Sequence, residues 1–199
     1  MEHNNGIYVN MLHYPVRTFG IGTRVGLWLQ GCSLKCDGCM SKHTWERNES
    51  YRTNLISLID KIKKYPTKAI TISGGEPFEQ YEALLFLVKA LKNYGFKDIL
   101  VYTGLKIDFI EKNYPDIFLY ISALVDGKFI KGENTNLVWK GSENQNLYVF
   151  TKEKELVEAY ESFAKEEEKK IQLIHKNDNI YLIGIPYEEN LEDILNGHD

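Results

Sequence analysis

The sequence predicts an α/β protein with a parallel sheet at its centre. Apolar segments of strand length alternate with segments whose apolar residues recur at helical spacing, an order typical of parallel strands covered by helices. Each of the first four main strands is followed by an unusual polar or glycine-containing cluster. Functional residues of such folds collect at the carboxyl ends of the strands, so we expect these clusters to line one site.

The elements of the first half follow from periodicity and from residues that end helices. Leu55, Leu58 and Ile62 recur at helical spacing, and Pro66 ends that helix. A second helix has a wide apolar face over residues 84–91, and Gly95 is suited to its C-terminal cap. Strands are expected at residues 7–13, 24–30, 69–73 and 99–102.

In the second half the pattern changes near residue 150. The expected elements are a helix at 107–114, strands at 117–125 and 147–150, a charged helix at 152–170, and a hairpin with strands 171–175 and 180–185 around residues 177–179. We therefore expect a core domain over residues 1–150 and a small extension, a helix and a β-hairpin, over residues 151–199.

Length and charge exclude several classes of protein. A chain of 199 residues suits one compact domain with a hydrophobic core. Its net charge of −4 argues against a nucleic-acid partner held by general electrostatic attraction. The sequence has no apolar run near the roughly 20 residues that a membrane span needs, and its N-terminus lacks the plan of a signal peptide. We expect a cytoplasmic protein without a membrane partner.

The three cysteines of the chain, Cys32, Cys36 and Cys39, share one loop with C-x3-C-x2-C spacing. They are too close together to staple distant segments, and their soft thiolates suit an iron–sulfur cluster or zinc. Three ligands on a four-iron cluster leave one iron open to a small chelating molecule. The alternative is a closed zinc site completed by His43, which would make the chain a non-catalytic zinc-binding module.

Two further clusters follow later strands. In the segment from Ser73 to Pro77, Gly74 and Gly75 permit close backbone approach, and Glu76 offers an acceptor for an ammonium group. Taken alone, this segment is better explained as a glycine-rich turn with a helix-capping glutamate. The segment around Thr103, which follows residues 99–102, is compatible with the end of any strand.

The cysteine spacing after a first strand, together with GGE, resembles the radical S-adenosylmethionine (SAM) enzymes. This resemblance implies an incomplete parallel (β/α) barrel of the radical SAM type. It implies that the three cysteines hold a 4Fe-4S cluster whose open iron SAM chelates before it is cleaved to a 5′-deoxyadenosyl radical. Glu76 would bind the SAM amino group, with Gly74, Gly75 and Thr103 shaping the pocket.

A narrower resemblance covers roughly residues 13–147. The segments LWLQGCSLKCDGCMSKHTW, ITISGGEPF, ILVYTG, ALVDGKFI and LVWKGSENQ, in this order, look like the activating enzymes of anaerobic (class III) ribonucleotide reductases. Those enzymes generate a glycyl radical on their partner. The resemblance implies that anaerobic ribonucleotide reductase or another glycyl-radical protein is the partner, and that a flavodoxin or ferredoxin-type protein donates the electron. It also implies that Asp126 lies near the site and binds cofactor. Four further residues belong to family motifs near the site: Trp139, Ser142, Asn144 and Gln145.

Departures from the family pattern leave the substrate open. Ile21 stands where a proline is usual, Met40 and Ser41 follow the last cysteine in place of an aromatic residue and asparagine, and Leu105 replaces a frequent tyrosine. The extension also lies beyond the minimal activating enzymes. The alternative is a stand-alone, activase-like radical SAM enzyme that acts on a peptide or a small molecule, with the extension serving either to cover the sheet or to bind a partner.

Overall fold

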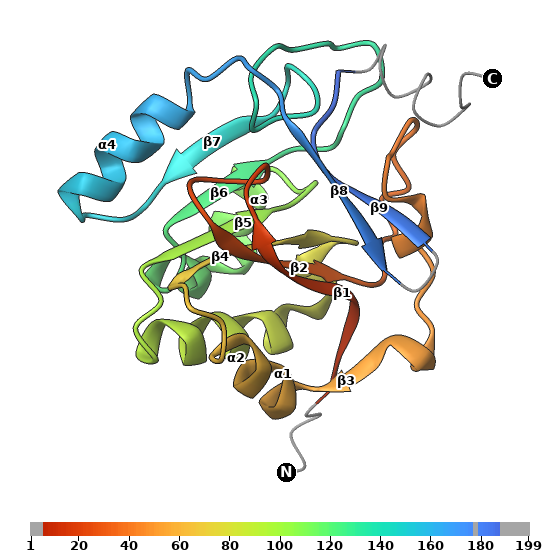
Figure 1. Ribbon diagram of the computed structural model, residues 1–199, viewed down its shortest axis with the longest axis vertical. Helices are drawn as coiled ribbons and strands as arrows, with labels where there is room; N and C mark the ends of the chain where they lie inside the picture. The colour runs from red at the N-terminus through yellow and green to blue at the C-terminus, as the bar shows by residue number, and fades with distance from the viewer. Residues whose placement is uncertain (1–5, 177–178, 188–199) are drawn as a thin grey trace.

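The computed structural model describes residues 6–176 and 179–187, and it contains one seven-stranded sheet and a separate two-stranded hairpin (Figure 1). The strands of the large sheet lie in the order β3-β1-β2-β4-β5-β6-β7. Their bounds are β1 Gly6–Val16, β2 Arg24–Leu29, β3 Arg52–Asn54, β4 Ala69–Gly74, β5 Asp98–Tyr102, β6 Ala123–Asp126 and β7 Asn146–Val149, with β8 Ile171–Lys176 and β9 Asn179–Gly184 in the hairpin.

The four central strands are parallel. β2 pairs with β4, β4 with β5 and β5 with β6 in parallel, whereas β1, β3 and β7 pair antiparallel at the two sides. The predicted α/β class with a parallel sheet at its centre is therefore confirmed. Among the described residues the outer strands β3 and β7 do not pair with each other, so the curvature of a partial barrel stays a prediction.

Within the described residues four α-helices accompany the sheet, and local capping groups mark one end of the first helix and one end of the second. The side chain of Asn54 accepts a hydrogen bond from the Ser57 amide at the start of the first helix, and Gly95 has a φ of +91° just after the second. None of the helices in the described part of the chain has the length and apolar character of a membrane span. Their bounds are α1 Leu55–Ile62, α2 Tyr81–Asn93, α3 Ile107–Asn113 and α4 Lys154–Phe163.

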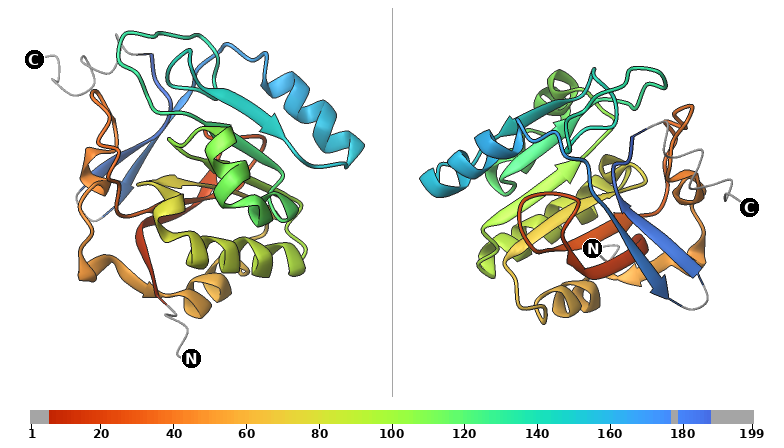
Figure 2. Two further views of the ribbon diagram at one scale, coloured as in Figure 1. Left: turned by 180° about the vertical axis from the view of Figure 1, so that it is seen from behind. Right: turned by 45° about the horizontal axis from the view of Figure 1, so that its top comes forward.

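The sheet has a separate hydrophobic core on each face. Along β5, Ile99 and Val101 pack into the core that α1, α2 and α3 cover, while Leu100 and Tyr102 pack into a second core on the opposite face. The second core is completed by residues of the extension: Tyr160, Phe163 and Ile183. Figure 2 shows the hairpin lying across the face of the sheet that α1 and α2 leave free. The extension therefore supplies core side chains.

A buried polar network joins α4 to the beginning of the central strands. Arg24 opens β2 and Asp98 opens β5, and the Arg24 Nη1 atom lies 2.8 Å from Asp98 Oδ2. The Tyr160 hydroxyl donates to the other oxygen, Asp98 Oδ1, at 2.6 Å. These groups are buried at the end of the sheet opposite the cysteine loop, which follows the last residue of β2.

Two predicted elements are wrong in extent. The strand expected at 117–125 is reduced to β6, because Pro115–Leu119 forms a 3-10 helix that begins on Pro115 and buries Ile117. The charged helix expected at 152–170 ends at Phe163, since residues 165–170 offer no apolar side chain to pack. The hairpin is found, although residues 177–178 of its expected turn lie outside the described residues.

Candidate functional site

The carboxyl ends of the parallel strands bring the predicted segments together, as expected. The Gly75 amide donates to the Leu29 carbonyl at 2.8 Å, and the Glu76 amide donates to the Gly31 carbonyl at 2.8 Å. Leu34, from the cysteine loop, occupies the place where a Cβ on Gly104 would project. Backbone bonds and close packing thus join the cysteine loop, the GGE segment and the segment after β5.

The cysteine loop is held by the segment that follows it. The Gly31 amide donates to the Thr44 carbonyl at 2.7 Å, and the Cys32 amide donates to the Trp45 carbonyl at 2.9 Å. The three thiols are free and partly exposed. Burial raises the pKa of Cys32, and burial likewise raises that of Cys36. Such a loop presents thiols to the surface while its backbone is fixed at both ends.

The spread of the thiols bears on what they could hold. Within residues 6–176 and 179–187, no three histidine, cysteine, aspartate or glutamate side chains gather closely enough to surround one metal ion. A mononuclear zinc site needs every ligand atom within about 2.0–2.3 Å of one ion. A four-iron cluster accepts each thiolate on a different iron, so separated thiols on one loop fit it better.

Close backbone approach explains both glycines of the GGE segment. Gly74 has a φ of +101°, and a Cβ there would clash with the Leu29 backbone. A Cβ on Gly75 would clash with the Gly31 carbonyl, which precedes the first cysteine. Any side chain at either position would force the two loops apart.

Glu76 is turned inward and is almost fully buried, with 2% exposed. Its Oε1 atom accepts from the Thr103 hydroxyl at 2.7 Å, and its Oε2 atom accepts from the Gly104 amide at 2.8 Å. Burial raises the pKa of Glu76 to about 7, although hydrogen bonds from Phe78, Thr103 and Gly104 lower it. The structure therefore brings the predicted residues Glu76 and Thr103 into direct contact, with a carboxylate able to accept a further donor.

Asp126 lies at the same edge of the sheet, but its carboxylate is engaged elsewhere. Oδ2 accepts from the Ile107 amide at 2.9 Å, and Oδ1 accepts from the Asn146 amide at 3.2 Å. Lys106 Nζ lies 3.8 Å from Oδ1. These contacts fix the starts of α3 and β7, and a role of Asp126 toward a cofactor stays a prediction.

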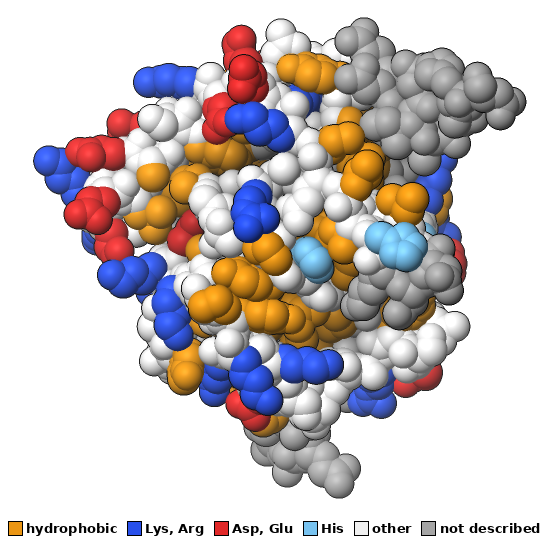
Figure 3. Space-filling model, viewed as in Figure 1, with side chains coloured by type: hydrophobic (Ala, Val, Ile, Leu, Met, Phe, Trp, Pro, Cys, Tyr) orange, Lys and Arg blue, Asp and Glu red, His pale blue; other side chains and the backbone are white. Residues whose placement is uncertain are grey.

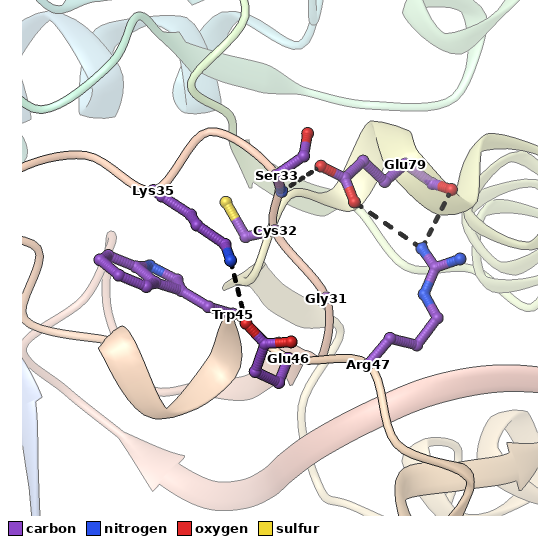
Figure 4. A pocket seen from close by; sticks show the side chains of 8 residues that line it. All are labelled: Gly31, Cys32, Ser33, Lys35, Trp45, Glu46, Arg47 and Glu79. Carbon is purple, nitrogen blue, oxygen red and sulfur yellow. Dashed lines mark hydrogen bonds and ion pairs between the residues drawn. The ribbon is translucent and has the colours of Figure 1, made fainter.

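A cavity of about 250 Å³ beside Cys32 contains residues that the sequence did not single out (Figure 4). Glu79 Oε1 accepts from the Ser33 amide at 2.6 Å, and the other Glu79 carboxylate oxygen lies 3.8 Å from Arg47 Nη2. Lys35 Nζ pairs with Glu46 Oε1 at 3.0 Å, and both residues line the cavity. Glu79 comes three residues after Glu76, and this spacing was the only signal that could have found it.

Four predicted motif residues follow the loop after β6. Trp139 is buried in the second core, where its Nε1 atom donates to the Ala164 carbonyl at 3.1 Å. Ser142, Asn144 and Gln145 instead make hydrogen bonds to the backbone of residues 127–130. Trp139 is thus a core residue, and the three polar residues organise a loop.

Comparison with known proteins assigns a family. A family profile described as "4Fe-4S single cluster domain" matches residues 18–148. The anaerobic ribonucleoside-triphosphate reductase-activating protein of Haemophilus influenzae is 33% identical over 148 residues, covering 69% of this chain and 96% of that protein. The protein of the same name from Escherichia coli K12 is 34% identical over 149 residues, covering 68% and 95%. A crystal structure of QueE from Escherichia coli matches with a TM-score of 0.45 and 24% identity over 51% of this chain and 53% of that one. The chain belongs to the 4Fe-4S single cluster domain family and is a relative of the anaerobic ribonucleoside-triphosphate reductase-activating proteins.

Proposed function

We propose that this protein is a radical SAM enzyme that generates the glycyl radical of an anaerobic ribonucleotide reductase. One observation carries the proposal. The loop with all three cysteines is hydrogen-bonded to the GGE segment through Gly31 and Glu76, so a cluster ligand set and a buried carboxylate lie side by side. Relatives that are activating proteins by name align along almost their whole length with this part of the chain.

In the proposed site, Cys32, Cys36 and Cys39 hold the cluster, and Glu76 accepts from the amino group of SAM. Bound together, a 4Fe-4S cluster and SAM supply an electron and, by reductive cleavage, a 5′-deoxyadenosyl radical that abstracts hydrogen. The Thr103 hydroxyl and the Gly104 amide orient the Glu76 carboxylate. The protein then acts mainly by positioning the reacting groups and by keeping water out of the site.

The finer features of the proposal follow the same reasoning. The parallel strands form the incomplete barrel, which leaves one side open to a large partner carrying a glycine loop. Residues 1–150 form the catalytic domain and residues 151–199 the extension. A flavodoxin or ferredoxin-type donor supplies the electron, and Asp126 helps to shape the SAM pocket. An oxygen-labile cluster suits the reducing cytoplasm.

The test is anaerobic. The protein is reconstituted with iron and sulfide, SAM and a strong reductant are added, and 5′-deoxyadenosine is quantified beside Cys36→Ala. Asp37→Ala is the matched control, since Asp37 is exposed on the same loop and carries no thiol. We expect product from the wild type and from Asp37→Ala, and none from Cys36→Ala. Equal product from all three would contradict the proposal.

A second set of measurements separates the alternatives. A glycyl radical detected by electron paramagnetic resonance on an added anaerobic reductase would establish the partner. Cysteine-dependent 5′-deoxyadenosine without any radical on the reductase would favour a peptide or small-molecule substrate. One zinc per chain, in place of iron and sulfide in near-equal amounts, would support the zinc-binding module.

A further inference from the structure

The loop between β6 and the GSENQ segment contacts the cysteine loop through Phe129. The backbone N–H of Phe129 donates a hydrogen bond to the Cys36 thiol. The half-buried ring of Phe129 lies between two glycines, and a Cβ added to Gly38 or to Gly141 would come within 3.0 Å or 3.1 Å of it. Phe129 therefore bridges the cysteine loop and the GSENQ segment, both with its backbone and with its ring.

Three side chains fix the peptide group that contains that N–H and the peptide groups before and after it. Gln145 Nε2 donates to the Gly127 carbonyl at 2.8 Å, and Asn144 Nδ2 donates to the Lys128 carbonyl at 2.9 Å. Ser142 Oγ accepts from the Ile130 amide at 3.1 Å. We call Ser142, Asn144 and Gln145 the loop clamp. Together they hold peptide groups both before and after Phe129.

The clamp is itself rigid. Gln145 Oε1 accepts from the Gly141 amide at 2.8 Å, and the Ser142 hydroxyl donates to Asn144 Oδ1 at 2.7 Å. Ser142 is completely buried, with 0% exposed. A loop anchored in this way presents the Phe129 N–H in one orientation, because a buried and satisfied network allows few alternative geometries.

We propose that the loop clamp is a positioning device that sets the reduction potential of the cluster by holding the Phe129 N–H against the sulfur of Cys36. The inference rests on the proposed function, in which Cys36 is a cluster ligand. Hydrogen bonds to ligand sulfurs are among the factors that set the potentials of iron–sulfur clusters. A donor at the sulfur stabilises the more negative, reduced state. Loss of the clamp therefore makes the cluster harder to reduce.

The test compares two glutamines that make the same pattern of bonds. Gln145→Met removes the donor to the Gly127 carbonyl without adding a charge near the cluster. Gln172→Met is the matched control, because Gln172 Nε2 donates to the Pro15 carbonyl at 2.8 Å and its Oε1 accepts from the Arg17 amide at 3.2 Å, on the hairpin. The midpoint potential is measured by an anaerobic redox titration of reconstituted protein whose iron and sulfide contents show an intact cluster.

We expect reduction of the Gln145→Met cluster to become about tenfold less favourable, a shift of about 59 mV to lower potential for one electron. Gln172→Met should match the wild type. Asn144→Leu, which removes the donor to the Lys128 carbonyl and is also neutral, is the second variant and should shift the potential in the same direction. Unchanged potentials in the clamp variants, with an intact cluster, would overturn the inference. A wild-type protein that takes up no cluster would instead overturn the proposed function.

Discussion

Tyr160→Phe tests whether the extension is part of the core. The variant keeps the ring, which is fully buried beside Phe163, and removes only the hydroxyl that donates to Asp98. Burial raises the pKa of Tyr160 well above its usual value, so the hydroxyl is a protonated donor at neutral pH. Without it, Asp98 Oδ1 loses its donor in a site that is largely buried.

The magnitude follows from the charge of the acceptor. A hydrogen bond to a charged group contributes about 1.5–3 kcal/mol, so we expect the free energy of unfolding to fall by about 2 kcal/mol. For a chain of 199 residues this corresponds to a melting temperature about 4–8 °C lower. Thermal unfolding is followed anaerobically by circular dichroism, with and without the cluster. The visible absorbance of the loaded protein should not change, because Asp98 and Arg24 begin their strands at the end of the sheet opposite the cysteine loop.

Tyr94→Phe is the matched control. Tyr94 is 48% exposed, so water replaces whatever its hydroxyl contacts, and the substitution should cost less than about 0.5 kcal/mol. If the two variants unfold at the same temperature, the reasoning is refuted. The Tyr160 hydroxyl would then contribute nothing measurable to the free energy of unfolding.

Three further predictions concern the candidate site. Because burial raises the pKa of Glu76 from 4.5 to about 7, the folded state retains a proton that the unfolded chain releases; this stabilisation is complete below pH 4.5 and is lost as the pH rises through 7. The free energy of unfolding of the cluster-free protein, measured by chemical denaturation, should therefore fall between pH 4.5 and 7 by about 3 kcal/mol more in wild type than in Glu76→Gln. Gly75→Ala should lose most of its cluster iron because the new Cβ meets the Gly31 carbonyl, whereas Gly95→Ala, with φ +91° but open space around it, should retain it. Exposure of the reconstituted protein to air should remove its visible absorbance and its 5′-deoxyadenosine production, and full activity after such exposure would argue against a 4Fe-4S enzyme.

The sequence predicted the site better than it predicted the connections that hold the site. Cys32 and Glu76 could be assigned because each follows an apolar strand, and parallel strands bring their carboxyl ends together. The contact between Thr103 and Glu76 follows from the same rule, since β4 and β5 are neighbours. The position of a site residue at a strand end can therefore be predicted from its local sequence.

Other features depend on partners that no local pattern encodes. Tyr160 and Asp98 are 62 residues apart, and nothing in the sequence of the charged helix indicates this contact. Asp126 was grouped with the cofactor residues through the family resemblance, yet its carboxylate bonds to the Ile107 and Asn146 amides. The hairpin was expected, and its apolar side chains differ in burial. Ile183 is buried in the second core, while Leu173 and Ile180 are 62% and 72% exposed. Figure 3 shows apolar side chains gathered on the face of the molecule that is viewed in Figure 1.

The second core also has a consequence for synthesis of the protein in the cell. Cys39 leaves the ribosome long before Tyr160, Phe163 and Ile183, which are needed to complete the packing of that core. At a translation rate of about 5–20 residues per second, the interval is on the order of 10 s. During this time the thiols are already made while one face of the sheet is still bare. The order of synthesis therefore leaves the cysteine thiols and the apolar face of the sheet exposed together until the extension has docked.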